Sequence, residues 1–474
     1  MSEKETIRSV DNQGRPYNRL WFIITLLTGT FSMSISQSSL STAYPTLMRT
    51  FNIGAPQVQW MTTGFMLVMS VMIPVSPWLL NNVKFTTLFR WVTAMFALGT
   101  LLCMTATNYP VLLIGRLIEA LGVGIIFPSF QTVLLTITPE NRRGATMGTA
   151  GLIMGSALAT GPIVSGIVLS FASWRGLFVL FFVLVTAVFI LSFWTIKDVM
   201  PVNRSTMDWL SIIYSLGFIG VLYVLNQIGV KGANWWLTAL LIISILALIG
   251  FCYRQLHRDQ PLLELRVFHS RLFTTGVLLT GASYIALIVT TIVLPLYYQN
   301  VLGLSALFSG LSLVPAAVGL SLLNPLSGHL MDRVGPRNVV FTGMILIVLG
   351  FGYLTIFARH LNVVSLILAS IVTEGGNAFV MMPAVTLGAN SLPDKLISHG
   401  TAVTTTARQI LGSAGVAAAT IILTRVTDAR KAAEGLHQAT LSGYQMTFLT
   451  FLIIGILGLA LTFTLPRGKQ EVTK

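Results

Sequence analysis

The feature that most constrains this chain is the apolar stretch 111–135, which carries two opposite charges. The stretch is long enough to cross a bilayer as a helix, yet it contains Arg116 and Glu119. Even on the mildest insertion scale, an ionisable side chain at bilayer depth costs roughly 2.5–3.5 kcal/mol. Because the two residues are three positions apart, they share a helix face and can pair. Either the pair only neutralises itself and fixes this helix to its neighbours, or Glu119 exchanges protons inside a transporter.

Composition places this helix in a protein with many membrane spans. Hydrophobic residues make up 54% of the 474 residues and charged residues 9%, whereas a water-soluble protein has about 25% charged residues. We therefore predict an all-α polytopic membrane protein. The formal net charge of +14 does not indicate a nucleic-acid partner, because the positive charges follow the topology described next.

Runs of about 20 apolar residues, bounded by charged or turn residues, mark the membrane spans. We predict fourteen spans: 20–42, 57–80, 86–106, 109–135, 144–170, 174–195, 208–228, 235–254, 272–299, 305–330, 338–358, 363–389, 399–424 and 444–465.

The basic residues give these spans an orientation. With the N-terminus inside, 20 of the 29 Lys and Arg residues fall in inner segments and 7 in outer ones. Basic residues are enriched in cytoplasmic loops, so this bias favours an even number of spans with both termini in the cytoplasm. We predict cytoplasmic tails at 1–19 and 466–474, in a multi-pass protein of the cell membrane, plasma or inner. The N-terminal tail is too polar for a signal peptide.

The two halves of the chain resemble each other. The segment 74–89, PVSPWLLNNVKFTTLF, aligns with 325–340, PLSGHLMDRVGPRNVV, and Pro128 aligns with Pro383 at a similar offset. Internal repeats of this kind are typical of transporters.

The repeat divides the chain between its two tails into three parts. We predict an N-terminal six-helix bundle at 20–195 and a C-terminal six-helix bundle at 272–465. Residues 196–271 then hold two inserted helices and a cytoplasmic loop.

The fifth predicted span has a face of small residues. They recur at spacings of mostly three or four: Gly144, Gly148, Gly151, Gly155, Ala159 and Gly166. In lipid such a face permits close packing of two helices. Pro162 removes one backbone hydrogen bond and bends the helix. The face is either a tight static contact or a bendable seam at which two bundles rock.

Several motifs together resemble the major facilitator superfamily, in particular its fourteen-span drug:proton antiporter branch, the multidrug-efflux type. In the fifth span, Gly155, Gly161, Pro162 and Gly166 resemble the antiporter motif of that branch. Residues 116–124, RLIEALGVG, resemble the fourth-helix motif, whose arginine is associated with proton transfer. The resemblance covers nearly the whole chain and implies the major facilitator fold, with two six-helix bundles plus two inserted helices.

A third motif, GHLMDRVGPR at 328–337, resembles the cytoplasmic loop motif that locks or releases the two bundles. The resemblance implies a cytoplasmic gate made by five residues: Gly328, Asp332, Arg333, Gly335 and Arg337. The chain also departs from the branch. Ser36 stands where the first helix commonly has an Asp, and Asn81-Asn82 replaces Asp-Arg in the first copy of the loop motif. We therefore expect the intact copy at Asp332 to dominate.

Only two carboxyl groups lie well inside predicted spans, those of Glu119 and Glu374. If proton exchange uses a membrane-buried carboxyl, these are the candidates. Burial raises the pKa of a carboxyl and a nearby arginine lowers it, so Arg116 would adjust the pKa of Glu119. Glu374 has no basic neighbour in its own span. Arg408 is a possible partner from another span, and a purely structural hydrogen bond to Asn377 is the alternative.

Polar side chains inside the spans are candidates for lining a substrate cavity: Ser36, Gln37, Gln131, Asn377 and Arg408. Aromatic and methionine side chains such as Phe127 and Met381 can form an adaptable apolar wall beside them. At helical spacing the same residues also serve as plain packing.

We therefore predict a proton-coupled antiporter that exports amphipathic drugs or dyes by alternating access. The drug substrates are implied by the resemblance. The alternative is a dedicated exporter of a metabolite, amino acid or lipid precursor on the same fold. The expected partners are small amphipathic substrates, protons and the lipid bilayer, and the expected state is a monomer.

Other functions and sites are not expected. The chain has no paired catalytic acids on one loop and no nucleotide-binding loop, so we predict no enzyme and no cofactor beyond the coupling proton. The six histidines lack ligand spacing, so we predict no metal site. Cys103 and Cys252 fall near opposite membrane faces and are not expected to form a disulfide.

Overall fold

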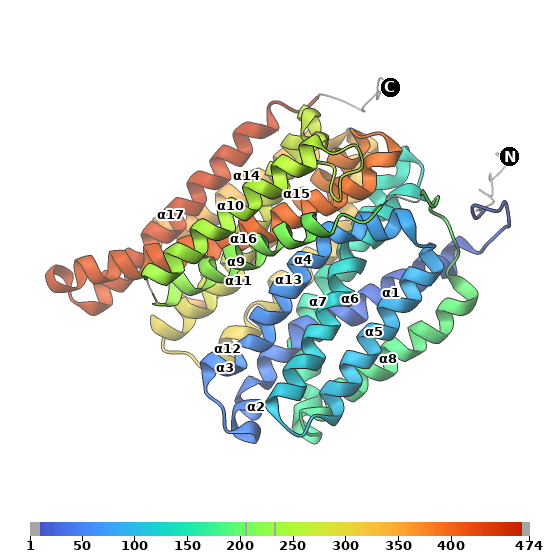
Figure 1. Ribbon diagram of the computed structural model, residues 1–474. Helices are drawn as coiled ribbons and strands as arrows, with labels where there is room; N and C mark the ends of the chain where they lie inside the picture. The colour runs from blue at the N-terminus through green and yellow to red at the C-terminus, as the bar shows by residue number, and fades with distance from the viewer. Residues whose placement is uncertain (1–9, 204–205, 232–233, 467–474) are drawn as a thin grey trace, which may run out of the picture.

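The computed structural model describes residues 10–203, 206–231 and 234–466, and within these ranges the chain forms helices and no β-strand (Figure 1). The predicted all-α membrane fold is confirmed. Residues 1–9 and 467–474 of the two predicted tails lie outside the described ranges.

The N-terminal half contains six long helices and two short ones. They are α1 (Arg19–Ser39), α2 (Tyr44–Phe51), α3 (Ala55–Val58), α4 (Trp60–Asn82), α5 (Phe85–Thr105), α6 (Tyr109–Thr136), α7 (Arg143–Phe171) and α8 (Arg175–Thr195). Helix α1 packs against α7 and α8, α5 packs against α6 and α8, and α4 packs against α6. The side chain of Asn108 caps α6 by accepting a hydrogen bond from the Val111 amide, which fixes where this helix begins.

The C-terminal half also contains six long helices. They are α11 (Arg271–Asn300), α13 (Val314–Val334), α14 (Pro336–Ile356), α15 (Val363–Asn390), α16 (Ile397–Glu434) and α17 (Leu436–Thr462), with the short α12 (Ala306–Leu311) before α13. Helix α15 packs against α11, α13 and α14, and α17 packs against α14 and α16.

Two further helices, α9 (Trp209–Lys231) and α10 (Trp235–His257), lie between the halves in sequence and pack against each other. Helix α9 also contacts α4 of the N-terminal half and α16 of the C-terminal half. The inserted pair therefore lies against helices of both halves.

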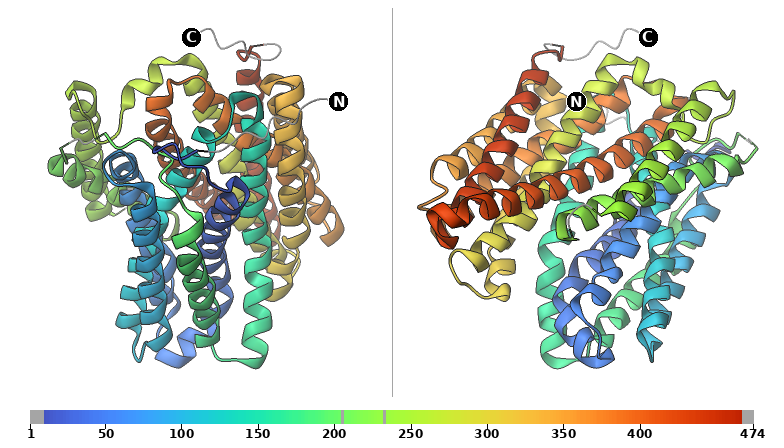
Figure 2. Two further views of the ribbon diagram at one scale, coloured as in Figure 1. Left: turned by 90° about the vertical axis from the view of Figure 1, so that its right-hand side faces the viewer. Right: turned by 60° about the vertical axis from the view of Figure 1, so that its left-hand side comes forward.

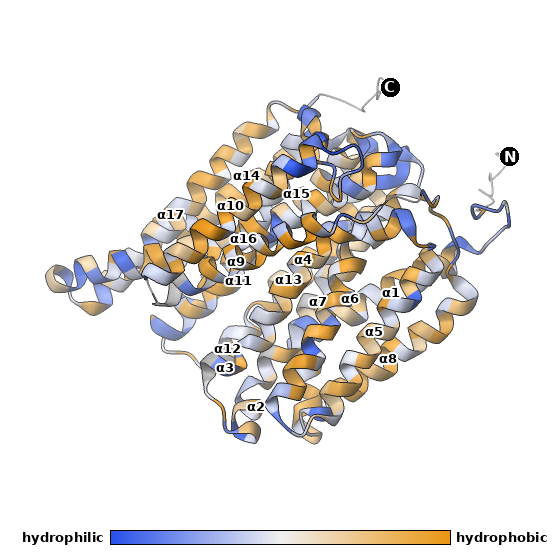
Figure 3. Cartoon of the chain, viewed as in Figure 1, coloured by the Kyte–Doolittle hydropathy of each residue, from blue (hydrophilic) through white to orange (hydrophobic). Residues whose placement is uncertain are grey.

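The helices have the length and hydropathy of membrane spans. Thirteen in the described ranges are long and apolar enough to cross a membrane, and α9 has a shorter apolar section, Trp209–Leu225. In Figure 3 hydrophobic residues run along the helices, while hydrophilic residues gather at the loops. The start of α1 and the end of α17 lie at the same end of the bundle, which we call the termini end (Figures 1 and 2).

The two halves touch mainly along α7 and α13, and where α4 and α6 meet α16. A Cβ atom at Gly148 would lie 2.5 Å from the carbonyl oxygen of Asn324, and one at Gly328 would lie 2.2 Å from that of Gly144. Only glycine lets two helix backbones approach so closely. Near the other end of α7, a Cβ atom at Gly166 would meet no atom within 4 Å. The halves thus meet near the termini end and diverge away from it (Figure 2).

Three predicted spans differ clearly from the observed helices. The span predicted at 305–330 is interrupted after α12, because Pro315 has no amide proton and starts a new helix. Helix α16 continues ten residues beyond the predicted end at 424, to Glu434. Its charged extension is rich in helix-forming Ala, Arg and Lys, so the helix continues after the hydrophobic span stops. Gly435, with φ +77°, ends it, and α17 starts at Leu436, before the predicted 444.

Asp208, which precedes α9, connects the two inserted helices at the termini end through contacts with arginines. Arg254 Nε and Nη2 donate to its two carboxylate oxygens at 2.8 and 3.0 Å, and Arg258 Nη1 lies 3.2 Å from one of them. Burial raises the pKa of the Asp208 carboxyl, but hydrogen bonds from Arg254 and Ser211 and the charge of Arg258 outweigh burial and lower it to about 2. The ionised carboxylate therefore holds α9 and α10 together at neutral pH.

Substituting Gly148 by Val should destabilise the protein by about 1–3 kcal/mol, because the new side chain would overlap the α13 backbone. The measurement is the melting temperature of the detergent-purified protein. Gly166→Ala on the same helix is the control, and its melting temperature should equal or slightly exceed that of the wild type, because the site is open. Equal melting temperatures for Gly148→Val and wild type would contradict the backbone contact.

The Asp208→Asn variant should melt at a lower temperature than the wild type at pH 7, because two arginines lose their charged partner. In the wild type the native pKa of Asp208 is lowered. The stabilisation that Asp208 provides is therefore complete above the unfolded pKa of about 3.9 and disappears as the pH falls toward 2. The difference in melting temperature should therefore narrow between pH 4 and pH 3. Asp428→Asn, at an exposed position of α16, serves as the control. If the difference in melting temperature between Asp208→Asn and the wild type stayed constant from pH 4 to pH 3, the stabilising role of the ionised Asp208 would be refuted.

Candidate functional site

The predicted ion pair is present and buried. Arg116 Nη1 contacts Glu119 Oε2 within α6, and the two residues are 1% and 0% exposed. The sequence spacing of three places both side chains on one face of the helix. Removing one partner of such a pair leaves an uncompensated buried charge, which typically costs about 3–5 kcal/mol.

Three other helices hold this pair. Thr100 of α5 donates a hydrogen bond of 2.7 Å to Glu119 Oε1, and Arg116 Nη1 lies 3.1 Å from Ser36 Oγ of α1. The guanidinium carbon of Arg116 lies 4.5 Å from the centre of the Phe65 ring of α4. At Ser36 the resemblance led us to expect an Asp, and here the serine hydroxyl oxygen accepts the hydrogen bond from the arginine. The site thus joins α1, α4, α5 and α6 of one half.

Glu374 lies in the corresponding part of the other half, on α15. Asn377 Nδ2 donates to Glu374 Oε2 at 3.1 Å, and Ser283 Oγ of α11 donates to Asn377 Oδ1 at 2.7 Å. The structural hydrogen bond considered for Glu374 is therefore present. The second oxygen, Oε1, is buried and has no hydrogen-bond partner among the described residues. Glu374 and Arg408 form no ion pair or hydrogen bond with each other in the described part of the chain.

The other cavity candidates fall into different surroundings. Gln131 of α6 is buried, and neither atom of its amide group has a hydrogen-bond partner within the described ranges. Arg408 of α16 is also buried, and Gln37 of α1 is half-buried. Phe127 and Met381 belong to one hydrophobic cluster that contains residues of both halves. Gln131 and Arg408 are therefore buried polar residues with atoms that have no hydrogen-bond partner among the described residues.

Two residues of the predicted antiporter motif on α7 face different helices. A Cβ atom at Gly155 would lie 2.9 Å from Ser321 Oγ of α13, and one at Gly161 would lie 2.0 Å from Ser38 Oγ of α1. Gly166 is exposed, and Pro162 lies inside the helix. The motif therefore brings α7 close to α13 and then to α1, and leaves its last glycine open.

Asp332 makes the central contact of the predicted gate. Its two carboxylate oxygens accept hydrogen bonds from the backbone amides of Gly144 at 2.9 Å and Ala145 at 2.8 Å, at the N-terminus of α7. A negative charge at a helix N-terminus satisfies free amides and complements the helix dipole. Asp332 belongs to α13, so this contact connects the two halves at the termini end.

The other predicted gate residues have separate surroundings. Gly328 makes the backbone contact with Gly144 described above, and Gly335, with φ +86°, ends α13. Arg337 Nη1 donates to the carbonyl oxygen of Leu465 at 3.3 Å, so it contacts the C-terminal end of its own half. Arg333 is exposed. Asp332 and Gly328 are therefore the gate candidates that contact the opposite half.

Arg143 is a further contact between the halves that the sequence analysis did not single out. Its Nη1 donates to Asn390 Oδ1 at the end of α15 at 3.0 Å, and its Nη2 lies 3.5 Å from Asp394 Oδ1. Its Nε donates to the carbonyl oxygen of Leu135 at 2.9 Å. The sequence contained one signal: the repeat aligns the loop before Arg143 with the loop that holds Asp394.

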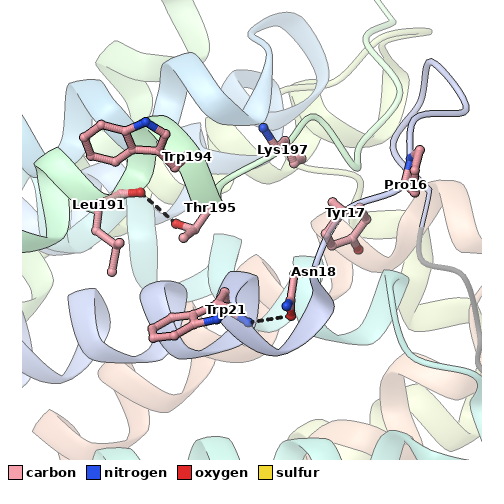
Figure 4. Close-up of a pocket in the computed structure, with 8 residues that line it drawn as sticks. All are labelled: Pro16, Tyr17, Asn18, Trp21, Leu191, Trp194, Thr195 and Lys197. Atoms are coloured by element: carbon pink, nitrogen blue, oxygen red, sulfur yellow. Dashed lines mark hydrogen bonds between the residues drawn. The ribbon is translucent and has the colours of Figure 1, made fainter.

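A surface pocket of about 450 Å³ lies where α1 begins and α8 ends (Figure 4). It is lined by Pro16, Tyr17, Asn18, Trp21, Leu191, Trp194, Thr195 and Lys197. None of the candidate site residues lines it. Trp21 and Trp194 are exposed, as tryptophans are at a membrane–water interface. This pocket is therefore a feature of the outer surface of the N-terminal half.

Known proteins match this chain over most of its length. A profile of the Major Facilitator Superfamily matches residues 26–416. The uncharacterised MFS-type transporter YcnB of Bacillus subtilis is 37% identical over 463 residues, which cover 96% of this chain and 97% of YcnB. The lincomycin resistance protein LmrB of Listeria innocua is 34% identical over 469 residues, which cover 96% of this chain and 98% of LmrB.

A solved structure supports the fold. The major facilitator proton:xylose symporter XylE superposes with a TM-score of 0.67 at 12% identity, covering 95% of this chain and 96% of that chain. At this identity the likeness concerns the fold alone. The matched proteins are transporters, which confirms that the chain is not an enzyme. On the family profile and on the relatives that match almost end to end, this chain belongs to the Major Facilitator Superfamily.

Proposed function

We propose that this chain is a proton-coupled antiporter that exports amphipathic small molecules by alternating access. The observation that carries the proposal is the fully buried Glu119, a carboxyl held by Arg116 inside a membrane span of a transporter. Ionisable residues at this depth mark ion and proton pathways by default. The related LmrB proteins are named for lincomycin resistance, which favours drug-like substrates.

In this mechanism Glu119 carries the proton and Arg116 stays charged throughout. When Glu119 is ionised, its carboxylate neutralises the guanidinium group and accepts the hydrogen bond from Thr100. When a proton binds the carboxylate, Arg116 keeps only Ser36 and the Phe65 ring as partners. Protonation therefore weakens the interactions that hold α6 to α1, α4 and α5. Glu374, with one free oxygen, is the second candidate carrier.

The conformational step is a rocking of the two halves about the α7–α13 contact. With Asp332 bonded to the N-terminus of α7, the termini end is closed. This end opens when Asp332 releases the amides of Gly144 and Ala145 and Arg143 releases Asn390. The distribution of basic residues supports a cytoplasmic orientation of this end. In this proposal the protein works as a monomer in the cell membrane of its host.

Glu119→Gln should abolish proton-driven efflux of a dye, because an amide cannot exchange the proton. The assay is efflux from de-energised, dye-loaded cells after a proton gradient is restored, at equal membrane expression. Glu374→Gln is measured in parallel and should reduce efflux if Glu374 also carries a proton.

A neutral double variant separates coupling from folding. Arg116→Gln/Glu119→Gln removes both charges together, so it leaves no unpaired buried charge and should retain the wild-type melting temperature more closely than Glu119→Gln alone. It should still lack proton-driven efflux. Efflux at the wild-type rate by both glutamate variants would show that the carboxyls are structural. Absence of wild-type efflux for every dye tested would favour the dedicated exporter.

Asp332→Asn should shift the protein away from the closed termini end. Loss of a charge at a helix N-terminus costs about 0.3–2 kcal/mol, so the closed population should fall relative to the open one by up to about thirtyfold. The measurement is a spin-label distance distribution between Asn141 and Lys395, which are exposed on the two halves at this end.

The distribution for Asp332→Asn should extend to longer distances than that of the wild type. Asp428→Asn, which removes an exposed carboxylate far along α16, should leave the distribution unchanged. Identical distributions for Asp332→Asn and the wild type would mean that the carboxylate does not hold the gate closed.

A further inference from the structure

Arg408 is a buried cation without a counter-charge. It lies in α16 and is 5% exposed, yet no described residue forms a hydrogen bond or an ion pair with it, and its Nε is buried without a partner. Its guanidinium group faces only the ring of Tyr284 of α11, at 5.2 Å. The two carboxyls inside the spans have other partners, Arg116 for Glu119 and Asn377 for Glu374.

Arg408 lies on the face of α16 that turns toward the N-terminal half. Thr401, two helical turns earlier on the same face, has its hydroxyl oxygen 2.6 Å from that of Thr132 of α6. Arg408 is therefore about 10 Å further along α16 than this contact between the halves, and about 16 Å from the start of the helix. This position is deep in the span and beside the surface where the halves meet.

The aromatic ring beside Arg408 is held in place by a hydrogen bond. The Tyr284 hydroxyl group donates to Gln409 Oε1 at 3.2 Å, which fixes the ring that the guanidinium group faces. The ring lies on one side of the guanidinium group, and no described residue accepts a hydrogen bond from its N–H edge. That edge presents parallel donors that match a carboxylate or a similar anion in a bidentate way.

We propose that Arg408 binds an anionic group, a carboxylate or a group of like geometry, on the transported molecule. The inference rests on the proposed export function and narrows its substrate class to molecules that combine an apolar body with a negative charge. Ionisable groups inside a span almost always pair with another group or face a water-filled cavity, and they mark substrate or ion pathways; no described carboxylate pairs with Arg408. An anionic substrate would provide that charge only while it is bound.

The test uses two dyes of opposite charge, the anion carboxyfluorescein and the cation ethidium. Binding to the detergent-purified full-length protein is measured by fluorescence anisotropy, and export is measured in re-energised cells. Arg408→Gln should weaken carboxyfluorescein binding by about tenfold or more, as expected for a lost charge-assisted hydrogen bond. Arg408→Lys, which keeps the charge but loses the planar edge, should be intermediate. Arg425→Gln, at an exposed position on the same helix, is the matched control and should bind as the wild type does.

The outcomes separate this site from the proposed function. Wild-type protein that exports ethidium but binds no carboxyfluorescein would overturn the anion site and leave proton-driven export standing. Carboxyfluorescein binding that depends on Arg408, without proton-driven export of either dye, would keep the site and overturn the function. Equal carboxyfluorescein binding by the wild type and by a folded Arg408→Gln variant, with unchanged melting temperature, would also overturn the site.

Discussion

The cost of placing a charge in a low-dielectric membrane interior governs the arrangement of this protein. Few charges lie inside the spans, and each has specific surroundings. Glu119 is paired with Arg116 and fixed by Thr100, while Glu374 has an amide partner for one oxygen only. Arg408 has a ring on one side and no carboxylate. None of these groups is needed to make a membrane helix, and we attribute their cost to the transport mechanism proposed above.

The second constraint is the backbone contact between α7 and α13, which makes the two halves unequal. Although the two halves of the chain align in sequence, the first copy of the loop motif has Asn81-Asn82 where the second has Asp332-Arg333. Only the second copy supplies a carboxylate, and it caps the N-terminus of α7 in the opposite half. The contact between a carboxylate and a helix N-terminus therefore occurs only once between the halves among the two copies of the motif, at Asp332. Arg143 adds to it from the other half by contacting Asn390 and Asp394.

The sequence was sufficient to predict the features that depend on residues close together in the chain. Hydropathy located the spans, and the spacing of Arg116 and Glu119 predicted their pairing, because both depend on residues near each other in the chain. Hydropathy located the ends of α16 and α17 less well, because the helix continues into a charged segment that is helix-forming in water. The contacts of Arg143, and the direction in which Arg337 points, depend on how distant helices pack, so no local pattern specified them. The isolation of Arg408 depends on the absence of a partner across several helices, which requires the complete packing.

Helix α1 provides a physical connection between the buried carboxyl and the contact of the two halves. Ser36 lies beside Arg116, and two residues later Ser38 donates a hydrogen bond of 2.7 Å to the carbonyl oxygen of Ala157 in α7. Gly161 packs directly against Ser38, so α1 and α7 cannot shift independently there. In the proposed mechanism, protonation of Glu119 would change the contacts of Arg116 and so act on α1, and through α1 on α7, which bears the main contact with α13. Such a chain of packed groups carries coupling when its members have two alternative arrangements, and the proposed mechanism requires a second arrangement of Arg116, without the carboxylate as its partner.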